Sequence, residues 1–115
     1  MDCIFCKIIA GEIPSDKVYE DDNVYAFRDI NPQAPVHVLV VPKAHIEGAD
    51  ELTVENASVV ADSFAAISQI ARELGLNEGY RIINNCGSHG QQSVRHIHFH
   101  LLGGVQMSGR LVEMA

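Results

Sequence analysis

The run HIHFHLL at residues 96–102 constrains the fold most, because histidine and apolar residues alternate along it. Successive side chains of a β-strand point to opposite faces of the sheet, so a strand would place the three histidines in one row. That row would consist of His96, His98 and His100, while the apolar residues between them would face the core. A helix would scatter the same side chains around its axis. We therefore predict a strand with a histidine face; the plainer alternative is an amphipathic strand whose polar face happens to use histidine.

The length and charge of the chain limit what it can bind. Its 115 residues suit one domain, spanning residues 1–115, with a single core but little room for an independent enzyme cleft, so a shared site or a dimer is expected. The net charge of -7 argues against non-specific binding to nucleic acid or anionic membranes, since both require clustered Lys and Arg. No apolar run approaches the roughly 20 residues of a membrane span, and the first residues lack the features of a secretory signal. We expect a cytoplasmic protein.

Hydrophobic periodicity and turn residues predict the remaining elements. Apolar residues at helical spacing indicate a short N-terminal helix and one long helix, and Gly75 stands where the residue after a helix belongs. Runs rich in β-branched residues indicate four strands before the histidine run, and turn residues join the first two as a hairpin. The predicted helices are residues 3–10 and 53–74, and the predicted strands are residues 17–20, 24–28, 36–41 and 80–84. The apolar stripe of the long helix must pack on one face of the sheet. We therefore predict a two-layer α+β domain with an antiparallel five-stranded sheet.

A row of histidines on a rigid strand suits chemistry at phosphorus. Neutral imidazole is nucleophilic near pH 7, and it serves as acid or base there without a large pKa shift. One histidine could attack, a second could contact the phosphate oxygens, and a third could fix its neighbour's tautomer. The preceding loop, residues 85–90, and the Ser93 hydroxyl would stabilise negative charge as it builds. The alternative is that two histidines spaced as His-x-His chelate Zn²⁺ or another transition metal.

Motifs along nearly the whole chain, from Asp2 to Met107, resemble one family. HIHFHLL matches the His-φ-His-φ-His-φ-φ signature, with φ apolar, that names the histidine triad (HIT) superfamily. The segments DCIFCKIIAGEIPSDKVYEDD, FRDINPQAPVHVLVVPKAHI and the two glycines after HLL resemble its Hint branch, the purine nucleoside phosphoramidases. The resemblance implies a homodimer whose sheets join across the interface. It also implies a purine nucleotide substrate whose P–N bond is hydrolysed to a nucleoside monophosphate and an amine, with no organic cofactor.

The resemblance assigns roles position by position. His98 matches the nucleophile that forms a nucleotidyl-histidine intermediate, and His100 matches the histidine that contacts the phosphate. The transferase branch has glutamine in place of the third histidine of the triad, so a histidine at position 100 favours hydrolysis. Supporting histidines of the site are implied for His37 and His96. Polar contacts to ribose or phosphate are implied for Asp29, Asn85 and Ser93. Apolar walls around the base are implied for Ile4, Phe5, Ile8, Phe27 and Ile30.

Three features depart from the family pattern. Gln91 stands where familiar Hint proteins have a glycine close to the phosphate, so the loop around it is expected to be shaped differently. Arg95 replaces an often aromatic or apolar residue. The tail, residues 105–115, lacks the Trp and prolines of the animal Hint C-terminus, a segment that reaches toward the partner subunit's site. The preference for the leaving amine is therefore open.

The pair Cys3-x-x-Cys6 predicts either metal binding or simple packing. In a reducing compartment, metal binding and packing both explain the pair better than a disulfide does. Packing is possible because a short helix can bury two cysteines as small apolar residues. With His45 and His96, the pair becomes a Cys₂His₂ set able to close a tetrahedral Zn²⁺ site, an arrangement that several bacterial members of the family resemble. Family members without the cysteines link the two histidines by hydrogen bonds. Zn²⁺ would be structural, because no ligand position stays open.

Other functions compete with the phosphoramidase. One is a dinucleoside polyphosphate hydrolase of the Fhit type, which LLGG after the histidines disfavours. A second is a dimeric nucleotide-binding regulator with incidental hydrolysis. A third is a metal site built on the histidine row itself.

Overall fold

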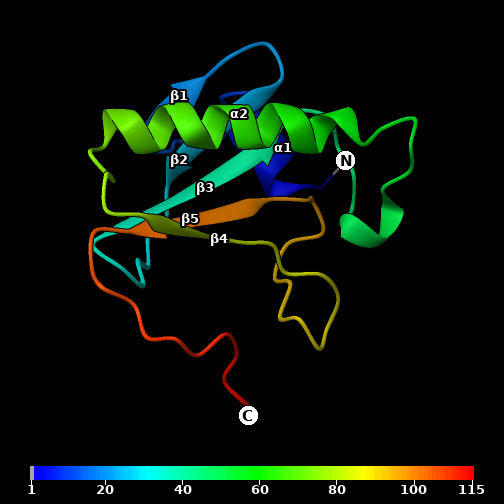
Figure 1. Cartoon of the computed structure of the whole chain (residues 1–115). Coiled ribbons are helices and arrows are strands. Elements are labelled where there is room, and N and C mark those ends of the chain that lie inside the picture. Colours follow the sequence, from blue (N-terminus) through cyan, green and yellow to red (C-terminus); the bar gives the residue numbers. More distant parts are fainter. Residues whose placement is uncertain (1) are drawn as a thin grey trace.

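The structure, a computed structural model, describes residues 2–115 and is built on one five-stranded antiparallel sheet (Figure 1). The predicted domain begins at residue 1, which lies outside the described residues. The sheet order is β1-β2-β3-β5-β4, which leaves β1 and β4 as its edges. The strands are β1 (Lys17–Glu20), β2 (Val24–Arg28), β3 (Val36–Pro42), β4 (Tyr80–Ile83) and β5 (Phe99–Gly103). The predicted α+β architecture is therefore confirmed, although β3 continues into Pro42, which pairs with Val24.

The long helix α2 (Ser58–Glu73) covers one face of the sheet. Its buried residues Ile67 and Ile70 pack with Val38 and Val40 of β3, the alternate residues that point to that face. The helix begins five residues later than predicted, because the amide of Thr53 bonds the Asn56 side chain in a separate turn. Its C-terminal end was predicted closely: Gly75 has a φ of 72°, the left-handed conformation that glycine adopts without cost. A short 3-10 turn, η1 (Ala49–Glu51), was not predicted.

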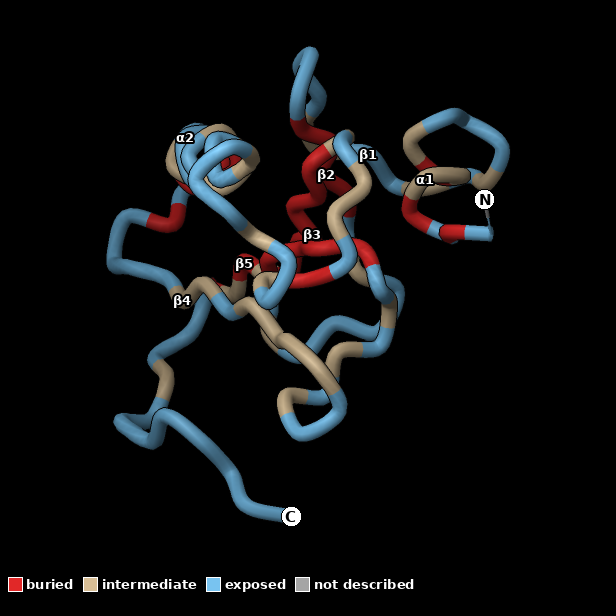
Figure 2. The backbone as a smooth tube through the Cα atoms, turned by 90° about the vertical axis from the view of Figure 1, so that its right-hand side faces the viewer, coloured by how far each residue is buried: buried red, intermediate tan, exposed pale blue. Residues whose placement is uncertain are grey.

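The short helix α1 (Ile4–Ile9) lies on the opposite face of the sheet, as the turned view of Figure 2 shows. Phe5 and Ile8 pack there against Phe27 of β2 and Leu39 of β3, forming a second, smaller apolar cluster. Strand alternation thus supplies both faces: one set of residues serves α2 and the other serves α1. Neither helix of the described residues combines the length and apolar character needed to cross a bilayer.

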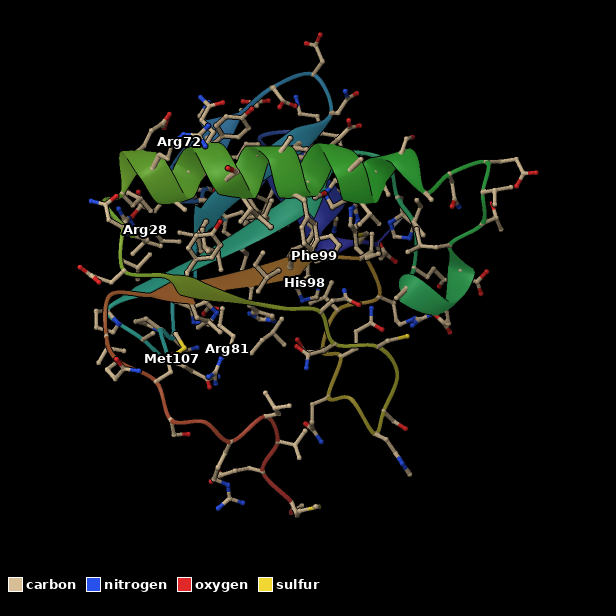
Figure 3. The ribbon with its side chains drawn as sticks, in the orientation of Figure 1. Arg28, Arg72, Arg81, His98, Phe99 and Met107 are labelled. Carbon is tan, nitrogen blue, oxygen red and sulfur yellow. The ribbon has the colours of Figure 1, made fainter. Side chains whose placement is uncertain are left out.

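The histidine strand is shorter than predicted. β5 begins at Phe99, so His100 lies within it while His96 and His98 precede it. In that preceding stretch the Ile97 amide donates to the Ile46 carbonyl at 2.7 Å, outside the sheet ladder. The prediction of one continuous strand was wrong because alternation alone does not reveal that these backbone groups bond to loops. The alternation of faces persists, however, since Ile97 and Phe99 join the core under α2. Figure 3 labels Phe99 and the neighbouring His98 at the start of this strand.

Candidate active site and metal centre

His98 is buried between two aromatic rings on the α1 face. Its ring centroid lies 4.9 Å from that of Phe5, edge to face, and 5.3 Å from that of His100. Its Nδ1 lies 2.7 Å from the carbonyl oxygen of His96. Because a carbonyl can only accept, Nδ1 must carry the proton, which leaves Nε2 with a lone pair. Burial lowers the pKa of His98, so the ring stays neutral near pH 7. This is the form that a nucleophile requires.

A second chain of hydrogen bonds fixes the proton on His100. The backbone amide of Gln33 donates to Nδ1 of His37 at 3.1 Å, so the proton of neutral His37 sits on Nε2. That Nε2 donates to Nδ1 of His100 at 2.9 Å. The proton of His100 is then on its own Nε2, on the side of the ring away from His37. His100 therefore offers an N–H donor where His98 offers a lone pair.

The register of the sheet explains why these two histidines meet. Leu39 lies opposite His100, and His37 is two residues earlier on the same face, so His37 is the diagonal neighbour of His100. Burial, followed by the neighbouring His98 and His37, lowers the pKa of His100 from 6.5 to about 4. Burial likewise lowers the pKa of His37, partly offset by Asp29. Both rings are neutral near pH 7, as the proton positions above require.

Asp29 stands beside this pair at the end of β2. Its Oδ2 lies 3.5 Å from Nε2 of His37, and its Oδ1 accepts from the amide of Asn31 at 2.8 Å. The side chain keeps 19% of its surface exposed, so it remains available to a ligand. A carboxylate can accept two hydrogen bonds at once, the requirement for gripping the two hydroxyls of a ribose. Contact with ribose remains a prediction.

The loop before the histidines is closed by Gln92, a residue that our sequence analysis missed. Its Oε1 accepts from the Gly87 amide at 3.1 Å, and its Nε2 donates to the carbonyls of Glu47 at 2.7 Å and Val94 at 2.9 Å. Arg95 donates to the same Oε1 at 2.7 Å, which accounts for the arginine that the family pattern left unexplained. One amide side chain thus joins both ends of the loop to the segment after β3. The only feature of the sequence that could have indicated this role is an amide side chain beside a glycine-containing turn.

The remaining polar candidates lie in or beside this loop. The Asn85 side chain donates to the Gly90 carbonyl at 2.7 Å, so it shapes the loop from within. Asn84, which was not singled out, donates to the His98 carbonyl at 2.9 Å. Gln91 is exposed and has a φ of 61°, a backbone conformation that favours glycine, the residue that the family resemblance implies at this position. Ser93 is exposed just after it.

The apolar candidates divide into two groups. Phe5, Ile8 and Phe27 are buried in the cluster beneath α1, where they pack as core residues. Ile4 and Ile30 are exposed, at 46% and 91% of their surface. The exposed isoleucines are accessible to a ligand, whereas the buried three belong to the apolar cluster. Contact with a base stays a prediction for all five.

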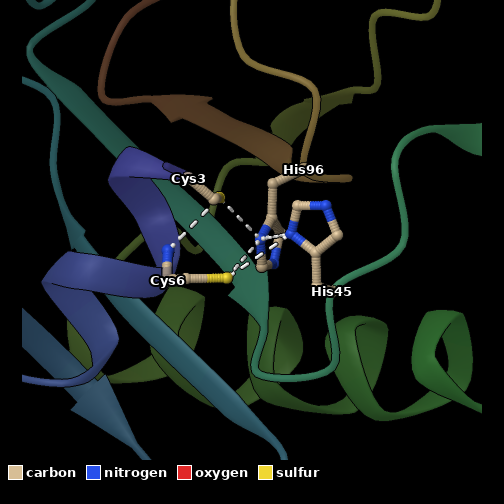
Figure 4. A group of neighbouring side chains, drawn as sticks. All are labelled: Cys3, Cys6, His45 and His96. Carbon is tan, nitrogen blue, oxygen red and sulfur yellow. Dashed lines mark hydrogen bonds between the residues drawn. The ribbon is translucent and has the colours of Figure 1, made fainter. Parts of the chain in front are cut away.

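Four side chains, from α1 and its cap residue, the segment after β3 and the stretch before β5, form a metal-ligand set (Figure 4). The sulfur and ring-nitrogen atoms of Cys3, Cys6, His45 and His96 all lie within 4.8 Å of one another. Nδ1 of His96 lies 3.3 Å from Sγ of Cys3, 3.6 Å from Sγ of Cys6 and 3.1 Å from Nδ1 of His45. The edges of a Zn²⁺ tetrahedron built from these atoms would be about 3.3 to 3.8 Å.

The proton on His96 also fits a metal site. Its Nε2 lies 2.7 Å from the Pro42 carbonyl and must donate to it, so Nδ1 faces the cysteines with a bare lone pair. A ligating histidine that donates its other N–H to a carbonyl is the usual arrangement around bound metals. Two sulfurs and two nitrogens are also the donor set that zinc prefers. The four residues therefore fit Zn²⁺.

A second group of potential ligands does not fit. Asp29, His37 and His100 also present oxygen and nitrogen atoms within 4.8 Å. However, the Gln33 amide occupies Nδ1 of His37, so Nε2 carries the proton and has no lone pair for a metal. These three residues hold protons in place rather than a cation. His98 belongs to neither group in the described part of the chain, which argues against a metal site built on the histidine row.

Comparisons with known proteins identify the family of the chain. The HIT domain model matches residues 10–107, and the chain belongs to the HIT domain family. The purine nucleoside phosphoramidase of Escherichia coli K12 is 49% identical over 102 residues, covering 88% of this chain and 86% of that protein. The 14 kDa zinc-binding protein of Brassica juncea is 48% identical over 109 residues, covering 93% and 96%. A HIT family hydrolase from Clostridium thermocellum has a TM-score of 0.94 at 49% identity, covering 96% and 97%.

Proposed function

We propose that this protein is a hydrolase that cleaves the P–N bond of purine nucleoside phosphoramidates, releasing a nucleoside monophosphate and an amine. The observation that carries the proposal is the arrangement of protons on two neighbouring buried rings. His98 offers a lone pair at Nε2, while His100 offers an N–H. A nucleophile and a donor side by side suit attack on a phosphoryl group whose oxygens gain charge in the transition state. The likeness to the E. coli phosphoramidase supports this substrate class.

The reaction proceeds in two steps. Nε2 of His98 attacks the α-phosphorus, and the new N–P bond forms as the P–N bond to the amine breaks; the departing nitrogen takes one proton from solvent and leaves as the neutral amine. Water then attacks the phosphorus of the nucleotidyl-histidine and gives up one proton to solvent, which releases the monophosphate and returns the electron pair to Nε2. The His96 carbonyl holds the Nδ1 proton throughout and stabilises the charge that His98 acquires in the intermediate. His100 donates to the phosphoryl oxygens, and Asp29 binds the ribose hydroxyls.

Mass spectrometry during turnover of an adenosine 5′-phosphoramidate tests this route. The wild-type protein, quenched without acid to preserve a phosphohistidine bond, should gain the mass of a nucleotidyl group, whereas His98→Ala should not. Full turnover by His98→Ala would overturn the mechanism. Faster hydrolysis of a diadenosine polyphosphate would assign the protein to the Fhit type. Normal binding of nucleoside monophosphate without turnover would make it a nucleotide-binding regulator.

The Cys₂His₂ cluster supports a proposal of one Zn²⁺ per chain. Bound there, the ion would supply a rigid cross-link between α1 and the residues around His96, with no coordination position left for substrate. The Brassica juncea relative, which is named a zinc-binding protein, supports this assignment. Metal analysis of the purified protein should give one zinc, lost in Cys6→Ser and retained in His100→Ala. Loss in His100→Ala alone would move the site to the histidine row.

We also infer a cytoplasmic homodimer. The edge strand β4 exposes Tyr80 and Ile83, at 41% and 36% of their surface, together with unpaired backbone groups that can extend the sheet into a second copy. A reducing compartment would keep Cys3 and Cys6 as thiols able to bind metal. Sedimentation should show a dimer for wild type and a monomer for Ile83→Lys. Cell fractionation tests the location.

A further inference from the structure

We propose that the Cys₂His₂ cluster positions the nucleophile, so that a metal ion bound by Cys3, Cys6, His45 and His96 controls the rate at which His98 is nucleotidylated. The inference rests on the proposed function and goes beyond it, because it gives the metal a role in the reaction rather than in folding alone. Two physical connections run from the cluster to the His98 ring, one on each side of it.

The first connection passes through His96. Its side chain is fully buried and held at both nitrogens, by the Pro42 carbonyl at Nε2 and by the cluster at Nδ1. Its own carbonyl oxygen accepts the Nδ1 proton of His98 at 2.7 Å. The residue that ligates the metal is therefore the one that fixes the tautomer and orientation of the nucleophile. Any freedom gained by His96 is transmitted directly to that hydrogen bond.

The second connection passes through α1. Cys3 caps this helix, its sulfur accepting from the Cys6 amide at 3.3 Å, and Phe5 lies between the two cysteines. The Phe5 ring packs edge to face on both His98, at 4.9 Å, and His96, at 6.0 Å. A helix of six residues has little stability of its own, so its position depends on what fastens it. The two sulfurs fasten the turn that holds Phe5 against the nucleophile.

Hydrogen-bond contacts link the four side chains of the cluster, and Nδ1 of His45 lies 3.1 Å from Nδ1 of His96. The sulfur-to-nitrogen distances of 3.3, 3.4 and 3.6 Å correspond to thiol hydrogen bonds. Metal ligation would replace these contacts with bonds that hold His96 and α1 together. We expect loss of metal to let the His98 ring leave its productive orientation, which lowers the rate of the first chemical step.

The experiment compares zinc-loaded wild type, wild type stripped with a chelator, and stripped protein returned to zinc. Cys6→Ser removes a ligand, and Cys86→Ser is the matched control, since Cys86 lies outside the cluster. The first readout is the exchange rate of the His98 Nδ1 proton by NMR. The second is the rate of adduct formation at saturating adenosine 5′-phosphoramidate. Stripping wild type tests the idea without any substitution, which covers the case of a poorly folded variant.

Stripped wild type and Cys6→Ser should show proton exchange at least about tenfold faster and adduct formation about tenfold slower than zinc-loaded wild type. Zinc should restore both values in wild type and Cys86→Ser but not in Cys6→Ser. Equal exchange and adduct rates with and without zinc would overturn the inference. If zinc-loaded wild type forms no adduct, the proposed function fails, while the exchange rate still decides whether the cluster positions His98.

Discussion

Nε2 of His37 lies 2.9 Å from Nδ1 of His100, and the direction of this hydrogen bond is set by a backbone amide. The Gln33 N–H donates to the far side of His37, which forces the His37 proton toward His100. The tautomer of His100 is thus imposed from the connection between β2 and β3, where two prolines restrict the chain. His37 need not touch the substrate to affect its chemistry.

Replacing His37 with Phe should slow the reaction without weakening nucleotide binding. Phenylalanine keeps the ring volume but cannot donate to Nδ1 of His100. The proton of His100 can then sit on either nitrogen, so only a fraction of the molecules present an N–H to the phosphoryl group. We expect kcat to fall by roughly 10- to 100-fold, the usual cost of losing a group that orients a reactive one. Steady-state kinetics and calorimetric titration with nucleoside monophosphate measure the two effects. A rise in Kd with unchanged kcat would show instead that His37 binds substrate.

Acid should destabilise the protein between about pH 6.5 and pH 4 through His100. Its folded-state pKa of about 4 lies below the ordinary value of 6.5, so in this window the unfolded chain binds a proton that the folded chain does not. The free energy of unfolding therefore falls as pH falls, by at most about 1.4 kcal/mol per pH unit from this group. His100→Gln should flatten the slope in urea titrations. His89→Gln, at an exposed loop histidine, is the control, and equal slopes in both variants would contradict the prediction.

Gln92→Glu should destabilise the loop that leads into the histidines. The change removes the N–H groups that bond the Glu47 and Val94 carbonyls and sets a carboxylate against both oxygens. We expect a loss of about 1–3 kcal/mol in the free energy of unfolding, together with a higher KM. Gln91→Glu makes the same chemical change one residue earlier, on an exposed side chain. If both variants lose equal stability, charge rather than the lost hydrogen bonds is responsible.

Gln91→Gly should stabilise the protein. Among the described residues Gln91 is the only non-glycine with positive φ, a conformation that costs other residues about 1–2 kcal/mol. Glycine relieves this cost but also increases the conformational entropy of the unfolded chain, which offsets part of the stabilisation. We expect the free energy of unfolding to rise by about 0.5–1 kcal/mol in total. Thermal unfolding measures it. The matched change Gln33→Gly, at an exposed residue without positive φ, should be neutral or destabilising.

The sheet was predictable because its strands alternate strongly and its turns carry distinctive residues. Both hairpin strands, β1 and β2, and the end of α2 at Gly75 were located from the sequence. The start of α2 was missed because the Asn56 side chain accepts from the Thr53 amide and holds these residues in a separate turn. Helix propensity alone does not predict such a side-chain hydrogen bond to the backbone. The late start of β5, at Phe99, was missed because the residues before it bond outside the sheet ladder: the Ile97 amide donates to the Ile46 carbonyl, and the His98 carbonyl accepts from the Asn84 side chain.

The candidate site was predicted in composition but not in proton positions. The alternating histidines and the Cys-x-x-Cys pair identified which residues to examine, and the structure brings Cys3, Cys6, His45 and His96 together. The tautomers depend on single carbonyls and amides, at Pro42, His96 and Gln33, that carry no side-chain signal. The role of Gln92 was missed for the same reason, since three of the four hydrogen-bond partners of its side chain are backbone atoms.

The two faces of β3 divide the molecule's tasks. Val38 and Val40 pack under α2, while His37 and Leu39 face the histidines and α1. Substitutions beneath α2 can therefore accumulate, trading volume among core residues, while catalytic geometry is left unaltered. A single inserted residue in this strand is different, because it would exchange the two faces beyond the insertion. The packing under α2 and the positioning of the histidines would then be lost together. Along β3, the core side chains beneath α2 can change, whereas the register and the residues on the histidine face cannot.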